Sequence, residues 1–166
     1  MGSYTFIKRK TEDAFEKLIV KYRGNDLQYT TDAGATANVP IFKVMSGVEF
    51  ITPRIMLGAS AEPEMFGDDE NVGGFFIGNW FVTITAVIVS SPYDVPRATH
   101  AERCGVIGDL FMRRDLPEQI NNLTDLPDFK AYTWRPGESG ADSISEDTVM
   151  TPFEGKLYCA PSVVET

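Results

Sequence analysis

The 166-residue sequence has few of the residue types on which catalytic and metal sites most often depend. It contains one histidine, His100, so a site built from several histidines is excluded. Its two cysteines, Cys104 and Cys159, lie far apart without the spacing of a metal site, and we expect two reduced, mostly buried thiols. The phosphate-loop pattern GxxxxGK[ST] is absent, and Gly73-Gly74 is typical of a turn because no helix is expected after it.

Long apolar runs are also missing. No window approaches the roughly 18 uninterrupted apolar residues that indicate a membrane-spanning helix, and the N-terminal stretch MGSYTFIKRK lacks the apolar region of a secretory signal. We therefore expect a protein that is made in the cytoplasm and does not enter a membrane. The hydrophobic fraction of 43% is ordinary, and the chain is long enough to bury a core as a single domain over residues 1–166.

Basic residues are missing from the whole stretch between Arg54 and Arg97. A net charge of −9 argues against a nucleic-acid platform, which needs clustered cations. The basic residues gather instead in residues 1–23, so either the two charged faces are both solvated or the basic face of one copy meets the acidic face of another. The acids in the stretch without basic residues could hold a hard cation, but they lack EF-hand spacing and are more typical of a solvated loop. They are Glu62, Glu64, Asp68, Asp69, Glu70 and Asp94. We expect no metal and no cofactor.

The densest run of β-branched and aromatic residues lies between Val72 and Ser91. Every second residue is apolar in the series Phe76, Trp80, Val82, Ile84, Ala86 and Ile88, which predicts a strand with one buried face. One continuous strand from Gly74 to Val89 would span about 50 Å, well beyond the usual strand of about 17–20 Å. Such a strand either bends, with Gly78 as the candidate position, or projects and is covered by another subunit.

Two helices are predicted on either side of this strand. The first begins with Thr11 as its cap, presents Phe15, Leu18, Ile19 and Tyr22 on one face, and ends at Gly24. The second covers residues 97–114, with Ala101, Cys104, Ile107, Gly108, Phe111 and Met112 on its packing side. Gly105 and Gly108 are unfavourable inside a helix, which indicates close contact with a strand or a neighbouring chain.

The remaining segments are shorter or irregular. Residues 25–38 are expected as loop or irregular edge strand, 52–71 as a long acidic loop, and 136–147 as a mobile link. Short strands are predicted at 41–45, 48–51, 129–134 and 149–159, and a helical turn at 115–121; Pro152 places the last strand at a sheet edge. The fold class is α+β, a mixed or antiparallel sheet with a long projecting hairpin, packed by the N-terminal helix and the helix after the hairpin.

The order of these elements resembles the tail terminator, or tail completion, proteins of long-tailed bacteriophages. The resemblance covers Thr11 to Trp134 and lies in the stop at Asp94-Val95-Pro96, in His100-Ala101-Glu102-Arg103, and in the run GDLFMRRDL from Gly108 to Leu116. It implies a non-enzymatic virion protein, assembled in the host cytoplasm, that forms a ring, typically a hexamer. Such a ring caps the tail tube protein and docks to the head–tail connector or neck proteins, and DNA passes through its lumen.

Under this resemblance the hairpin and the following helix contact other subunits. The residues expected there are Phe76, Gly78, Trp80, Val82, Gly105, Gly108 and Phe111. Three alternatives remain open: another neck, head-closure or tail-tube subunit; a monomeric β-rich protein with a ligand pocket lined by Phe75, Trp80 and Phe81; and a hydrolase using His100 with a loop carboxylate. A surface or interface position is favoured for His100 over a role as general base.

Overall fold

The computed structural model describes residues 3–43, 52–63, 71–72, 75–76, 79–91, 100–124, 130–137, 140–145 and 147–160. The predicted strand at 48–51, the turn at Gly73-Gly74, the bend at Gly78 and the acids from Glu64 to Glu70 lie outside these residues.

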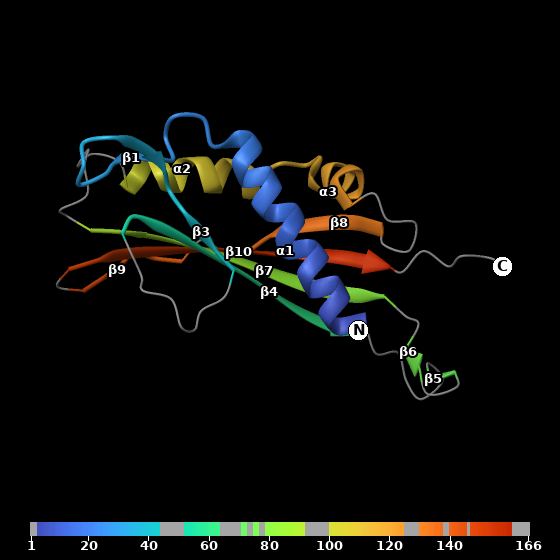
Figure 1. The fold of residues 1–166 in the computed structure, drawn as a ribbon. Helices are drawn as coiled ribbons and strands as arrows, with labels where there is room; N and C mark the ends of the chain where they lie inside the picture. The colour runs from blue at the N-terminus through green and yellow to red at the C-terminus, as the bar shows by residue number, and fades with distance from the viewer. Residues whose placement is uncertain are drawn as a thin grey trace.

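A six-stranded sheet forms the centre of the molecule (Figure 1). Its strands follow the order β3 (Ile41–Phe42), β4 (Arg54–Pro63), β7 (Trp80–Ser90), β10 (Val149–Ala160) and β8 (Lys130–Pro136), with β9 (Ser143–Ile144) paired to β10. The β3–β4 pair is parallel and the other pairs are antiparallel, so the sheet is mixed. A separate hairpin joins β1 (Gln28–Thr30) to β2 (Thr36–Asn38).

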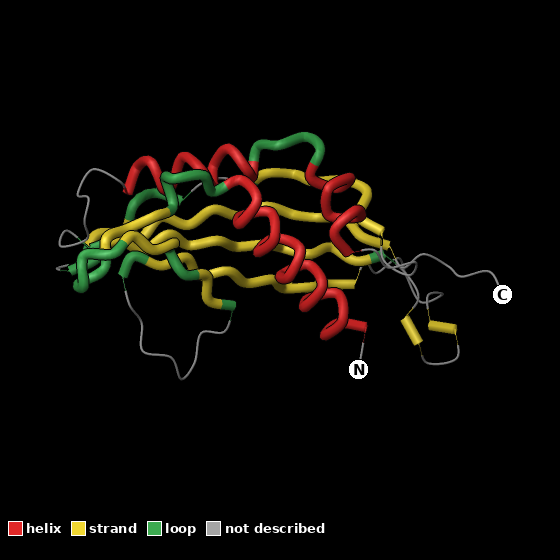
Figure 2. The backbone as a smooth tube through the Cα atoms, turned by 45° about the horizontal axis from the view of Figure 1, so that its top comes forward, coloured by secondary structure: helices red, strands yellow, loops and turns green. Residues whose placement is uncertain are grey.

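The described helices cover one face of this sheet (Figure 2). They are α1 (Ser3–Tyr22), α2 (His100–Phe111) and α3 (Leu116–Thr124). Helix α1 packs mainly on β4, α2 on β10 and β7, and α3 on β8. The predicted α+β class, with one helix before the central hairpin and another after it, is confirmed.

Strand β7 carries the alternation predicted from the sequence. Val82, Ile84, Ala86 and Ile88 are fully buried under the helices, and Trp80 is 7% exposed. Phe81, in the opposite register, is 39% exposed. Because side chains alternate along a strand, this difference divides the sheet into a core face and an opposite face on which none of the described helices lies, which we call the uncovered face.

Helix α1 starts eight residues before its predicted cap, at Ser3 rather than Thr11. Thr11 is buried inside the helix, where its hydroxyl donates to the carbonyl of Ile7 at 2.7 Å, so the capping prediction is wrong. The predicted apolar face and end are confirmed: Phe15, Leu18 and Ile19 are fully buried, and Gly24 follows the helix with a φ of 52°.

The predicted loop over 52–71 is wrong for its first half, which is strand β4. Its residues Ile55, Leu57, Ala59 and Ala61 are all buried on the core face. Small residues on this strand give weak strand propensity, so the period was hidden in the sequence. They suit the place where α1 lies directly against the sheet, as Figure 1 shows.

The single strand predicted from Gly74 to Val89 is divided in the structure. The part paired with β4 and β10 begins at Trp80, and β5 (Asn71–Val72) pairs with β6 (Phe75–Phe76) in a separate two-stranded sheet. Figure 1 shows this small hairpin beyond the end of the main sheet. It lies in the connection between β4 and β7.

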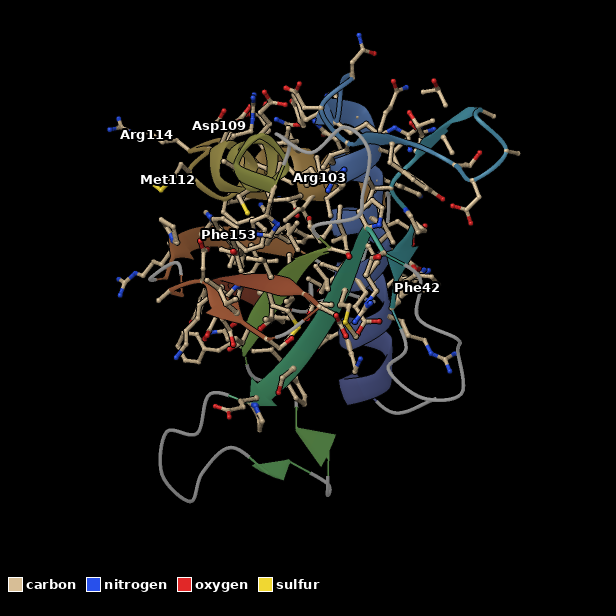
Figure 3. The ribbon with its side chains drawn as sticks, turned by 90° about the vertical axis from the view of Figure 1, so that its left-hand side faces the viewer. Phe42, Arg103, Asp109, Met112, Arg114 and Phe153 are labelled. Atoms are coloured by element: carbon tan, nitrogen blue, oxygen red, sulfur yellow. The ribbon has the colours of Figure 1, made fainter. Side chains whose placement is uncertain are left out.

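Helix α2 ends at Phe111, three residues before its predicted end, and its packing face differs from the predicted one; the predicted start at 97–99 lies outside the described residues. Ala101 is exposed and Met112 is 69% exposed, although both were expected to pack, while the charged Arg103 is buried at 1% exposure. Figure 3 shows Met112 on the outside of the helix layer and Phe153 between α2 and the sheet. The helical turn predicted at 115–121 is confirmed as α3.

Strand β10 lies between β7 and β8, so the edge position predicted from Pro152 is wrong. The carbonyl of Pro152 accepts from Gly140 N at 2.9 Å, on the side away from β7. A residue in a strand directs its N–H and C=O to the same side, so the missing N–H of proline costs no bond to β7. The link predicted at 136–147 also contains ordered structure, because β9 pairs Ile144 with Val149.

An aromatic cluster joins the helices to the sheet. Trp134 lies 5.3 Å from Phe15 and 5.4 Å from Phe111 between ring centroids, and its indole N–H donates to the carbonyl of Phe111 at 2.6 Å. A methyl group built on Gly155 would lie 2.2 Å from the Trp134 ring. Glycine is therefore required on β10 opposite this indole.

Gly155→Ala is expected to destabilise the protein by about 1–3 kcal/mol, because the fixed indole has no room to move. Gly105→Ala is the matched control: nothing lies within 4 Å of the added methyl group, and this exposed helix position should gain about 0.5–1 kcal/mol. Urea unfolding measures both. Equal stability of the two variants would contradict the packing described for Trp134.

Candidate functional site: the uncovered face of the sheet

The uncovered face is formed by β4, β7, β10 and β8, and the strand register places its side chains in rows. One row contains Glu62, Phe81, Tyr158 and Thr133, which are partners across successive strands. The next row contains Ser60, Thr83, Lys156 and Arg135. Side chains in one row lie about 5 Å apart and act as neighbours.

Two aromatic rings belong to the first of these rows, and a third, that of Tyr132, adjoins it on β8. Phe81 lies 5.1 Å from Tyr158 between ring centroids, and Tyr158 lies 6.4 Å from Tyr132. Tyr132 is 50% exposed. Exposed aromatic side chains that touch one another are typical of surfaces that bind another molecule.

An open hollow of about 500 Å³ lies over this face. Its lining residues are Glu62, Phe81, Thr83, Thr133, Arg135, Lys156 and Tyr158. It combines one acid on β4 with two cations on β10 and β8, and aromatic rings stand between them. Within the hollow, the negative charge therefore lies on β4 and the positive charge on β10 and β8.

Toward each of its two edges, the sheet has a backbone position that bonds to a polar side chain from a helix. Glu12 of α1 accepts from the N–H of Ala59 on β4 at 3.1 Å and is itself paired with Lys8. On the other side, Asn121 of α3 donates to the carbonyl of Ala131 at 2.8 Å and accepts from its N–H at 2.7 Å. At these positions a strand from another chain cannot pair without displacing a helix side chain.

Replacing Asn121 by alanine should leave both backbone groups of Ala131 without this partner. We expect a loss of about 1–3 kcal/mol in unfolding free energy, together with slow aggregation through the newly available strand. The control is Asn122→Ala at the adjacent exposed position. Denaturant unfolding and light scattering measure the two effects; the same behaviour in both variants would show that the amide does not protect this strand.

A second polar cluster surrounds the single histidine at the start of α2. His100 Nδ1 lies 2.8 Å from Ser90 Oγ, and His100 Nε2 lies 2.8 Å from Thr151 Oγ1. Thr151 in turn donates to Asp142 at 2.5 Å, and Arg103 donates to Ser90 at 2.9 Å. The imidazole thus connects the first residue of α2 to the ends of β7 and β10.

The hydrogen-bond partners determine the protonation state of His100. Thr151 uses its one proton on Asp142, so it must accept from Nε2–H of the imidazole. Ser90 already accepts from Arg103 and can donate its proton to Nδ1. The imidazole and the hydroxyls of Ser90 and Thr151 all have matching partners when the ring is neutral with its proton on Nε2.

Cys104 also approaches this ring, with Sγ 3.5 Å from His100 Nε2. No such pairing was proposed from the sequence, although the spacing of four residues on one helix predicts it. The pair is poorly suited to nucleophilic catalysis. Nε2 already carries a proton, and burial raises the pKa of the Cys104 thiol, so the thiolate is disfavoured.

Burial lowers the pKa of His100 below its ordinary value; Asp142 opposes this shift and Arg103 adds to it. The unfolded chain therefore binds a proton that the folded chain resists, and stability should fall as pH drops through about 6.5. Because the chain has one histidine, NMR titration of its ring reports this group alone. We expect a pKa below 6.5 and the Nε2–H tautomer; a pKa above 6.5 or the Nδ1–H tautomer would contradict the network.

The residues predicted to contact other subunits are not brought together on one surface. Val82 is fully buried and Trp80 is 7% exposed on the helix-covered face of the sheet, and Phe111, the last residue of α2, is 3% exposed. Gly108 lies against β10, where an added methyl group would be 3.3 Å from the ring of Phe153. Gly105 faces open space on the exposed side of α2.

Two of the predicted contact residues, Phe76 and Gly78, belong to the connection between β4 and β7. Phe76 belongs to β6, but its side chain and the whole of Gly78 lie outside the described residues. The pocket predicted from Phe75, Trp80 and Phe81 is not formed as expected, because Trp80 and Phe81 lie on opposite faces of the sheet. The sequence interpretation also missed Tyr132, Arg135, Lys156 and Tyr158, which meet only through strand pairing.

Comparison with known proteins gives no assignment: no protein-family model matches the chain, and no curated protein matches its sequence. Among the described residues, no helix is long and apolar enough to cross a membrane. Within the same residues, no three His, Cys, Asp or Glu side chains lie close enough together to hold a metal ion.

Proposed function

We propose that this chain is a structural subunit of a bacteriophage virion, a tail terminator that forms a ring. The ring would cap the tail tube protein and dock to the head–tail connector, with DNA passing through its lumen. The observation that carries the proposal is the hairpin of β4 and β7. These strands pair continuously from Arg54 with Val89 to Pro63 with Trp80, and their connection continues beyond the sheet into β5 and β6.

A hairpin whose tip lies beyond its own sheet is suited to contact a neighbouring copy. Glu12 of α1 and Asn121 of α3 bond to the backbone of β4 and β8, which favours assembly through such a tip over simple strand addition. A net charge of −9 also suits a conduit, because repulsion of phosphates lets DNA slide through the lumen. No catalytic role is needed for this function, and His100 serves to attach α2 to the sheet.

Removal of the hairpin tip tests the proposal. Residues 64–79 are replaced by an Asn-Gly turn, which can join Pro63 to Trp80 because they are register partners. Native mass spectrometry and electron microscopy should show a ring for the full chain and a folded monomer for the shortened chain. A full chain that stays monomeric would contradict the ring, and a shortened chain that still forms rings would contradict the role of the tip.

Two other functions keep some support. A neck, head-closure or tail-tube subunit would share the ring and differ in its docking partners. A monomeric ligand-binding protein is supported by the open hollow of about 500 Å³ on the uncovered face. A monomer in the mass measurement, with a small molecule bound in this hollow, would favour the second function.

A further inference from the structure

We infer that the uncovered face of the sheet binds the same face of a second copy, in a twofold face-to-face contact. The face is defined by β4, β7, β10 and β8, with the exposed ring of Phe81 on it and that of Tyr132 beside Tyr158 at its β8 edge. The inference does not rest on the proposed ring. A ring needs a head-to-tail contact between different surfaces, whereas a twofold contact uses one surface twice and closes on itself.

The strand order determines which strands meet across such a contact. A twofold axis parallel to the strands, between β7 and β10, places β4 of one copy over β8 of the other and β7 over β10. Packed sheets are about 10 Å apart, with strand directions within about 30°. The rows established by the register then show which side chains meet.

In the first row, Phe81 of one copy meets Tyr158 of the other, which places two aromatic rings at the centre of the contact. Glu62 meets Thr133 in that row. Arg135 is two residues along β8, about 6.6 Å away, so its guanidinium can reach the Glu62 carboxylate of the other copy. Twofold symmetry forms this ion pair twice.

The next rows add no conflict of charge. Thr83 meets Lys156, Ser60 meets Arg135, and Thr85 meets Glu154. No two side chains of like charge face each other in these rows, although the face carries both acids and bases. This self-complementarity favours a second copy over nucleic acid, because Glu62 and Glu154 on the face would repel phosphates.

The size of the face predicts a weak contact. Its open part follows β4 from Gly58 to Glu62, whereas Met56 and Val89 further along the same face are buried. Four strands over about six residues cover roughly 400 Å² per copy, or about 800 Å² in total. Stable interfaces bury at least about 1,200 Å², so the association should depend strongly on protein concentration.

Sedimentation equilibrium of the full chain over a wide range of concentration tests the contact. Glu62→Lys and Arg135→Glu should each weaken self-association at least tenfold, because like charges then face each other across the interface. The two substitutions in one chain should restore association to within about threefold, since each ion pair is re-formed with its charges exchanged. Both side chains are exposed, so the variants should fold normally.

Matched controls carry the same charge changes on the helix-covered side, as Lys17→Glu in α1 and Glu118→Lys in α3, both at exposed positions. They should leave association unchanged. The inference would be overturned by single variants that associate normally or by a double variant that associates as weakly as the single ones. It would also be overturned by controls that lose association equally, or by a chain that is monomeric at all concentrations. If rings form through the hairpin tip, the face-to-face contact joins two rings. Substitutions of Glu62 and Arg135 that leave the mass of the assembly unchanged would then overturn only the face-to-face contact, and not the ring.

Discussion

The structure depends on the pairing of β7 with strands on both of its sides. Ten residue pairs join it to β4 and eleven join it to β10, so its backbone is fully occupied within one chain. The core then forms on the face where Val82, Ile84, Ala86 and Ile88 lie, because these side chains need cover from water. Three described helices supply that cover, and none of the described helices lies on the other face.

The polar contacts keep this one-sided arrangement in register. Glu12 and Asn121 connect α1 and α3 to the backbone of β4 and β8, and His100 connects α2 to the ends of β7 and β10. Each helix is thus bonded to the sheet as well as packed on it. Removal of one partner leaves a buried polar group unsatisfied, which costs more than the bond itself contributes.

Sequence patterns predicted those elements in which apolar residues recur at a regular spacing within one segment of the chain. The alternation in β7 and the apolar face Phe15, Leu18 and Ile19 were visible because each series has a clear period. Strand β4 was missed because its alanines and glycine have weak strand propensity, although Ala59 and Ala61 suit the core face beneath α1. The candidate site was missed because Tyr132 and Arg135 lie far along the chain from Phe81, and only the register of β8 and β10 brings them together.

We infer that one face of the sheet is completed by this chain and that the open part of the uncovered face is completed by another molecule. Hydroxyl-radical footprinting at low and high protein concentration tests it directly, with exposed Met112 on α2 as the internal reference. We predict that Phe81 and Tyr132 become protected as the mass increases, while buried Trp80 stays unreactive throughout. Unchanged reactivity of Phe81 and Tyr132 in an assembly of higher mass, or oxidation of Trp80 in the folded monomer, would contradict the account.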